Sequence, residues 1–235
     1  MYSPQFIGHF NGFVTFVPFL FTCHQLSKKR SLICHMPPLV LLTDNLGICL
    51  NASRGNMGMK AIQPIAKLDF AFSFYCLQHR YSHPLARISK AVSHTGDGHL
   101  YVIFACLAWG IDGVSGKGFV ITGLLAFLFE LPMYWVLKNS FQRRRPQELS
   151  PLLPAFITPS DRYSLPSGHT AAAFVMATLM SHWYPDVAGM AFVWAALIGS
   201  ARIMLGVHFL SDVLIGALLG NGCATLSLIL LESRL

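Results

Sequence analysis

Charged side chains are scarce in this sequence of 235 residues, because Asp, Glu, Lys and Arg together make up only 11% of it, whereas ordinary soluble domains contain about a quarter. Apolar residues account for 54%. This balance excludes an ordinary soluble domain and predicts a chain that crosses a membrane several times. We expect an all-α integral membrane protein, with a helical bundle of five to six transmembrane helices and an interfacial amphipathic helix.

Cysteine pairs and nucleic-acid motifs are also missing. The six cysteines show no CxxC spacing, and Cys106 and Cys223 lie inside apolar runs, so we interpret them as unpaired packing residues without a metal or disulfide role. The formal charge of +7 is not accompanied by a basic-aromatic motif for nucleic acid. We therefore predict that the partner is an anionic small ligand or a lipid headgroup, with no nucleic acid, metal or cofactor. The sequence does not indicate an oligomeric state.

The first 60 residues lack a run long enough to cross a membrane. Their two apolar stretches are short or interrupted by polar residues, and neither reaches the roughly 20 residues of a spanning helix. We predict a poorly defined N-terminal extension at 1–60 and a membrane-embedded domain at 61–235. The functional chain is expected to start near Met57 or Met59, and peptides from residues 1–50 in mass spectra of the natively expressed protein would refute this.

The rest of the chain consists of apolar runs bounded by polar clusters. Residues 61–92 mix apolar and charged side chains, which is typical of a helix lying along the membrane interface. Five spans follow, with a loop expected at 112–118, and they cover 99–111, 119–137, 170–183, 187–205 and 213–231. Polar clusters stand after the second span, before the third and between the fourth and fifth. The alternation of crossings therefore predicts that all three clusters lie on one membrane face.

The first cluster contains Lys138 and Arg145, followed by Pro146. Basic residues at the end of a span often serve only as interfacial anchors. In the functional interpretation, Lys138 acts as a point charge and Arg145 as a bidentate donor to phosphate oxygens, while Pro146 ends the helix and aims Arg145. We interpret Arg143 and Arg144 as lipid headgroup contacts and not as site residues.

The second cluster, Pro166 to His169, directly precedes an alanine-rich apolar run. Ser167 suits the N-cap of a helix, where unpaired amide groups and the positive end of the helix dipole attract anions. One interpretation is a plain helix start. In the functional interpretation, the amides of Ser167 and Gly168 hold phosphate oxygens and His169 protonates a leaving alkoxide.

The third cluster contains Arg202, His208 and Asp212. A spacing of four residues brings His208 and Asp212 to one face if the last helix has already begun. A carboxylate on one ring nitrogen of His208 fixes the tautomer and leaves the other nitrogen to attack phosphorus, although such a pair alone is more often a satisfied interfacial pair. Arg202 reaches the same site only if the helix breaks, and Gly206 is the expected position of that break.

Together the three clusters resemble the type 2 phosphatidic acid phosphatase superfamily, whose pattern is K-x6-R-P, P-S-G-H and S-R-x5-H-x3-D. The matching residues are Lys138, Arg145, Pro146, Pro166, Ser167, Gly168, His169, Arg202, His208 and Asp212. The resemblance covers about residues 68 to 231, and order and spacing agree in all three blocks. One departure is Ala201, which stands where the family usually has Ser and so removes a hydroxyl near the site.

The resemblance implies a metal-independent membrane lipid phosphatase that works through a phosphohistidine intermediate. His208 is the implied nucleophile, Asp212 orients it, and His169 protonates the leaving group. The phosphoryl oxygens are implied to bind Lys138, Arg145, Arg202, Ser167 and Gly168. The implied substrate is a phosphate or diphosphate monoester of a lipid, such as undecaprenyl diphosphate, phosphatidylglycerophosphate or phosphatidic acid.

Two other functions are compatible with the three clusters. A lipid-diphosphate phosphotransferase passes the phosphoryl group to an acceptor other than water, and a transporter or structural membrane protein uses the same cations only as anchors. The bacterial relatives imply a bacterial inner membrane with the site on the periplasmic face, whereas the positive-inside rule alone places that basic face in the cytoplasm. Glu130, an ionisable residue inside a span, is expected to have a structural role.

Overall fold

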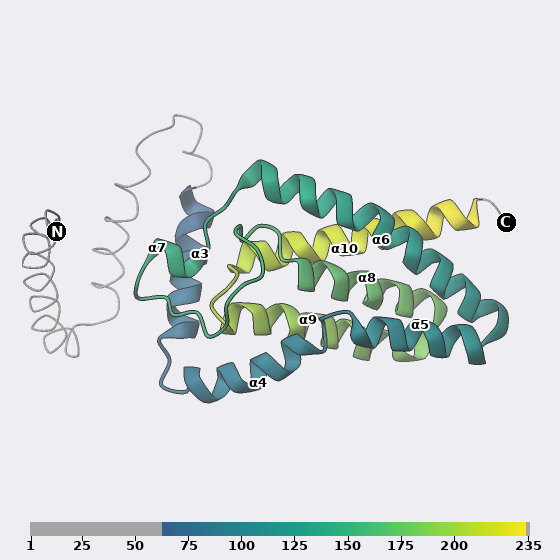
Figure 1. Ribbon diagram of the computed structural model, residues 1–235, viewed down its shortest axis with the longest axis horizontal. Helices are drawn as coiled ribbons and strands as arrows, with labels where there is room; N and C mark the ends of the chain where they lie inside the picture. Colours follow the sequence, from purple (N-terminus) through teal and green to yellow (C-terminus); the bar gives the residue numbers. More distant parts are fainter. Residues whose placement is uncertain (1–62, 234–235) are drawn as a thin grey trace, which may run out of the picture. The chain divides into compact units, whose positions relative to one another are not determined.

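The computed structural model describes residues 63–233. Within these residues the fold is all-helical (Figure 1), as predicted. The predictions for residues 1–60 lie outside the described residues. The helices are α3 Gln63–Leu77, α4 Ser82–His94, α5 His99–Ile111, α6 Gly113–Phe141, α7 Pro146–Leu149, α8 Gly168–Trp183, α9 Ala188–Met204 and α10 Leu210–Glu232, with a 3-10 turn at Pro185–Val187 before α9.

The predicted amphipathic segment 61–92 contains two helices and not one, because α3 ends before α4 begins. Pro84 lies in the first turn of α4. A proline is tolerated there but would interrupt a helix continuing from α3, since it has no N–H for the bond to the preceding turn. α3 has the two faces expected at a membrane surface. Its exposed apolar residues are Ile65, Leu68, Phe72 and Tyr75, and its buried residues are Asp69, Phe70, Ser73, Cys76 and Leu77.

Three helical segments of the described residues are long and apolar enough to cross a bilayer, at 113–149, 185–204 and 210–232. The expected loop at 112–118 is mostly helical, because Asp112 alone separates α5 from α6. The glycines of this region serve close packing, since a Cβ atom on Gly116 would lie 1.8 Å from a carbonyl oxygen of α5. α5 and α8 are shorter, with 13 and 16 residues, so the total of five to six spans stays a prediction.

Helix α8 packs against α6, α9 and α10, and Figure 1 shows it between α9 and α10. Its contact with α10 depends on Gly220, where a Cβ atom would lie 2.1 Å from the carbonyl oxygen of Ala171. Small residues of this kind let two helix backbones approach closely. The approach brings the first turns of the two helices together, and the N–H of Ser167 donates to the carbonyl of Asp212 at 3.1 Å.

The connection between α9 and α10 confirms the predicted break. Five residues separate the two helices, and Gly206 among them has a φ of +73°. A Cβ atom there would also lie 2.1 Å from the carbonyl oxygen of Pro154, so the position requires glycine. Because the chain turns here, Arg202 at the end of α9 and His208 in the connection line the same cavity.

Candidate active site

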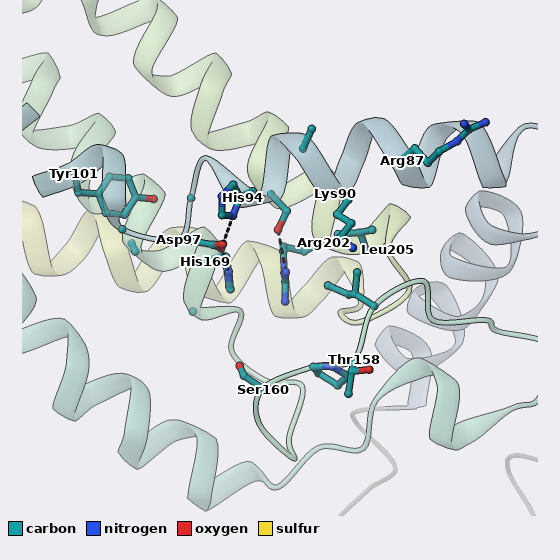
Figure 2. Close-up of a pocket in the computed structure, with 18 of the residues that line it drawn as sticks. Arg87, Lys90, His94, Asp97, Tyr101, Thr158, Ser160, His169, Arg202 and Leu205 are labelled. Atoms are coloured by element: carbon teal, nitrogen blue, oxygen red, sulfur yellow. Dashed lines mark hydrogen bonds and ion pairs between the residues drawn. The ribbon is translucent and has the colours of Figure 1, made fainter. Parts of the chain in front are cut away.

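Residues from the second and third clusters line one small cavity. It has a volume of about 220 Å³, and Gly168, His169, Arg202 and His208 are among its lining residues. A larger cavity of about 1050 Å³ shares the first three of these residues and extends along α4 (Figure 2). The structure therefore brings together side chains that the sequence placed on one membrane face.

His208 lies in the connection before α10 and is almost fully buried. Its Nδ1 is 2.7 Å from the carbonyl oxygen of Ser164 and 3.8 Å from Asp212 Oδ2. The two side chains face each other as predicted, although the helix has not yet begun at His208, because α10 starts only at Leu210. Nδ1 donates to the Ser164 carbonyl, which can only accept, so Nε2 is the unprotonated nitrogen.

The buried environment of His208 also determines its charge. Burial disfavours the imidazolium and lowers the pKa of His208 to about 4, although Asp212 acts in the opposite direction. The imidazole is therefore neutral near pH 7, and a neutral ring nitrogen is the form that a nucleophile requires.

Asp212 is fully buried at the start of α10 and accepts from two donors. Its Oδ2 accepts from the N–H of Phe209 at 2.8 Å, and its Oδ1 accepts from Arg143 Nη1 at 2.7 Å. The interpretation of Arg143 as a headgroup contact is therefore wrong. Helical periodicity gives no guidance here because α6 ends at Phe141, and of the adjacent arginines it is Arg144 that stays exposed.

Lys138 and Arg145 meet at Asp161, a residue that the sequence analysis missed. Lys138 Nζ contacts one carboxylate oxygen of Asp161 and Arg145 Nη2 contacts the other. The hydroxyl of Tyr134 donates to the same carboxylate at 2.6 Å, and Arg145 also donates to the carbonyl of Val207 at 2.6 Å. The carboxylate of Asp161 thus lies between the two buried cations, where we predicted a phosphate group.

The charge of Asp161 is stabilised by these contacts. Burial tends to raise the pKa of its carboxyl group, but hydrogen bonds from Lys138 and Tyr134 outweigh this effect and hold the pKa at about 2. Asp161 is therefore ionised and offsets part of the charge of the two cations. Its sequence signal is weak, because it lies in the irregular segment between α7 and α8, where no periodicity applies.

Ser167 directly precedes α8 as predicted, but its hydroxyl and its N–H already have hydrogen-bond partners within the protein. Its hydroxyl pairs with Thr170 Oγ1 at 2.8 Å, and its N–H donates to the Asp212 carbonyl. Gly168 begins α8, whose first amides have no acceptor within the helix, and it lines the small cavity. Of the two predicted amide donors, Gly168 is therefore the one placed at the cavity, and a Cβ atom there would approach the Tyr134 ring to 3.1 Å.

His169 has a carboxylate partner that the sequence analysis did not predict. Its Nε2 lies 2.8 Å from Asp97 Oδ1, and Asp97 Oδ2 lies 2.6 Å from His94 Nδ1 (Figure 2). Burial tends to raise the pKa of Asp97, but the hydrogen bonds to His94 and His169 lower it overall. Burial and the nearby Arg202 lower the pKa of His169, and the hydrogen bond to Asp97 acts in the opposite direction. Asp97 therefore supports the protonated form of His169, which is the form that donates a proton to a leaving group.

Arg202 is a buried cation with an unfilled hydrogen-bond donor. Its Nη1 donates to Ser93 Oγ at 2.9 Å, whereas its buried Nε has no partner within residues 63–233. An unpaired buried donor is costly, and more so when it is charged. A bound anion would offset this cost, and Arg202 gives the cavity that it lines the positive charge of an anion-binding site.

Glu130 is a buried acidic residue at the same cavity. Glu130 on α6, for which we expected a structural role, is buried and lines the 220 Å³ cavity together with both histidines.

In the described part of the chain, no group of three or more His, Cys, Asp or Glu side chains is arranged to hold a metal ion. The cysteines of that part are free, and Cys76 and Cys223 are buried whereas Cys106 is exposed.

Two solved structures have folds similar to that of this chain. LpxE from Aquifex aeolicus has a TM-score of 0.58 and 30% identity, and the match covers 68% of this chain and 94% of LpxE. A transmembrane PAP2 type phosphatidylglycerolphosphate phosphatase from Bacillus subtilis has a TM-score of 0.57 and 24% identity, and the match covers 83% of this chain and 96% of that protein. The second likeness concerns the fold alone.

Sequence comparison leads to the same family. A probable lipid phosphate phosphatase beta from Arabidopsis thaliana is 29% identical over 133 residues, which are 44% of this chain and 62% of that protein's length. The sequence pattern of the PAP2 superfamily matches residues 118–234, a range that contains all three polar clusters. The chain therefore belongs to the PAP2 superfamily.

Proposed function

We propose that this protein is a membrane lipid phosphatase that hydrolyses a phosphate or diphosphate monoester of a lipid through a phosphohistidine intermediate. The observation that carries the proposal is the small cavity lined by His169, His208 and Arg202, whose buried Nε has no partner among the described residues. The apolar helices around this cavity and membership of the PAP2 superfamily support a lipid as the substrate.

The two histidines divide the chemistry between them. Nε2 of His208 attacks phosphorus, and an N–P bond forms while the bond between phosphorus and the leaving oxygen breaks. His169, paired with Asp97, gives its proton to that oxygen. Water then cleaves the N–P bond and returns a proton to His169, so that inorganic phosphate leaves and both histidines regain their starting forms.

The phosphoryl oxygens are held by donors at the cavity. Arg202 supplies Nε, and the amide of Gly168 supplies the positive end of α8. Lys138 and Arg145 join them when the phosphate displaces the carboxylate of Asp161, whose side chain is 36% exposed and can turn towards solvent. Asp212 supports His208 from the side away from the substrate.

The larger cavity of about 1050 Å³ beside α4 has room for the part of the substrate beyond the phosphate. We keep undecaprenyl diphosphate, phosphatidylglycerophosphate and phosphatidic acid as candidate substrates. The similar Arabidopsis protein is named as a probable lipid phosphate phosphatase, which supports a lipid phosphate in general. Transfer of labelled phosphate to an added acceptor instead of water would identify a phosphotransferase.

The test is phosphate release by the detergent-purified protein from these three lipids, with EDTA present and His208→Ala measured in parallel. We expect release from at least one lipid and its loss in the variant. Equal release by the variant, or no release from any lipid phosphate, would contradict the proposal.

We also propose a bacterial inner membrane location with the site on the periplasmic face. Alkaline phosphatase requires an extracytoplasmic environment with oxidising conditions. A fusion at Gln147, next to the first cluster, is therefore expected to be active, and an inactive fusion there would place the site in the cytoplasm.

A further inference from the structure

A buried chain of charges links helix α3 to Asp212. Arg143 lies between two carboxylates, with Nη1 at 2.7 Å from Asp212 Oδ1 and Nη2 at 2.6 Å from Asp69 Oδ2. The side chains of Asp69 and Asp212 are 4% and 0% exposed. The side chain of Arg143 is 22% exposed, so the guanidinium is partly hydrated, whereas the two buried carboxylates depend on its contacts to offset their lost hydration.

Additional contacts fix the guanidinium and both carboxylates. Arg143 Nη1 also donates to Ser211 Oγ at 2.6 Å, and the guanidinium carbon lies 4.3 Å from the centre of the Phe209 ring. Both oxygens of Asp69 accept from Ser211, with the N–H at 3.0 Å from Oδ1 and the hydroxyl at 2.5 Å from Oδ2. Asp69 thereby holds α3 to the first turn of α10, directly beside the catalytic carboxylate.

We propose that Arg143 and Asp69 are positioning residues, with Arg143 fixing the Asp212 carboxylate beside His208 and Asp69 fixing Arg143. The inference rests on the proposed function, because it concerns how His208 is supported. Asp212 lies 3.8 Å from His208 Nδ1, so its effect on the ring is electrostatic and depends on where its two donors, Arg143 and the Phe209 amide, hold it.

The two residues act on His208 with opposite sign. The positive charge of Arg143 opposes protonation of His208, and the negative charge of Asp69 opposes the effect of Arg143. The other charged groups near His208 are not altered by these substitutions. Those that act on its charge are Asp212 on α10, Arg202 on α9 and Arg145 before α7, and His169 on α8, Glu130 on α6 and Asp161 before α8 line the same cavity.

The experiment compares Arg143→Gln, Arg143→Lys, Asp69→Asn and Ser211→Ala in the purified full-length protein, with phosphate release measured across pH. Arg144→Gln is the matched control, because it makes the same change at the adjacent exposed arginine. All variants are assayed with one lipid substrate, so the ionisation of the substrate affects every pH profile equally. Differences between the pH profiles therefore come from the enzyme.

We expect Arg143→Gln to lower kcat about 10- to 100-fold, as misplacing a catalytic group does, with KM within about twofold of wild type. Arg143→Lys should recover part of the loss. The acid limb of the pH profile reports the protonation of His208. It should move to higher pH by about half a pH unit in Arg143→Gln and to lower pH by a similar amount in Asp69→Asn. This is the size expected for one charge acting on His208 across a partly screened distance. Ser211→Ala, which removes only a hydroxyl group, should lower kcat several-fold.

Three results would overturn the inference in an active wild-type protein. They are Arg143→Gln behaving like Arg144→Gln, KM rising while kcat is unchanged, or both acid limbs moving in the same direction. If Arg143→Gln does not fold, Asp69→Asn and Ser211→Ala provide the test. The inference is overturned if both of these variants keep the kcat and the acid limb of the wild-type protein. An inactive wild-type protein would instead contradict the proposed function.

Discussion

Replacing Asp161 with asparagine tests whether its carboxylate competes with the substrate phosphate. Asp161 contacts both Lys138 and Arg145, the two cations that the family pattern assigns to phosphate. Asparagine keeps the size of the side chain but removes the charge. We therefore expect opposite effects in the variant: a less stable empty protein and a higher affinity for phosphate.

The magnitude follows from the charge of Asp161 in the folded protein. A pKa of about 2 against an ordinary value of 3.8 corresponds to about 2 kcal/mol of interaction with the surroundings. The side chain is 36% exposed, so solvent screening reduces this to about 1 kcal/mol. The free energy of unfolding should fall by about that amount, and the same difference should tighten phosphate binding about fivefold.

The assay measures thermal unfolding and the dissociation constant of inorganic phosphate in detergent, for wild type and Asp161→Asn. Glu148→Gln is the control, since it makes the same chemical change at an exposed position of α7. Saturating phosphate should restore the stability of Asp161→Asn. Weaker or unchanged phosphate binding in Asp161→Asn would refute the competition, because Asp161 would then order the two cations for the substrate or have no influence on it.

The pH dependence of stability provides a second check on Asp161. Its pKa is lower in the folded protein than in the unfolded chain, so its contribution to stability is present above about pH 4 and is lost as the pH falls through about 2. The stability difference between wild type and Asp161→Asn should therefore be constant near neutral pH and decrease below about pH 4. A difference that grows in acid would contradict this assignment.

Three further predictions concern the proton donor His169, the turn at Gly206 and the absence of a metal requirement. Asp97→Asn should move the basic limb of the pH profile to lower pH, because His169 loses its counter-charge at 2.8 Å; an unmoved limb in the phosphate-release assay would refute the pairing. Gly206→Ala should lower the free energy of unfolding by about 2 kcal/mol or more through strain at positive φ, with Gly222→Ala as control because a Cβ atom there has nothing within 4 Å. EDTA should leave phosphate release unchanged, and loss of activity that Mg²⁺ or Zn²⁺ restores would contradict a metal-independent mechanism.

The sequence determined the long apolar helices and the residues of the second and third clusters that line the small cavity. Apolar runs at 119–137, 187–205 and 213–231 correspond to α6, α9 and α10, because a segment that must be apolar along its whole length is visible in composition alone. The break at Gly206 was also readable, since the spacing of Arg202 and His208 required a turn and glycine permits one.

Tertiary structure alone decided which charged groups support the predicted residues. Asp69 of α3 and Asp97 of the turn after α4 pair with residues more than 70 positions away in the sequence, and Asp161 pairs with Arg145 across the end of α6 and the segment before α8. The direction of Arg143 likewise depends on where α3 and α10 lie beyond the end of α6. Composition and periodicity report burial along one segment, whereas the pairing of two buried charges depends on contacts between segments, so these four residues became visible only once the helices were packed.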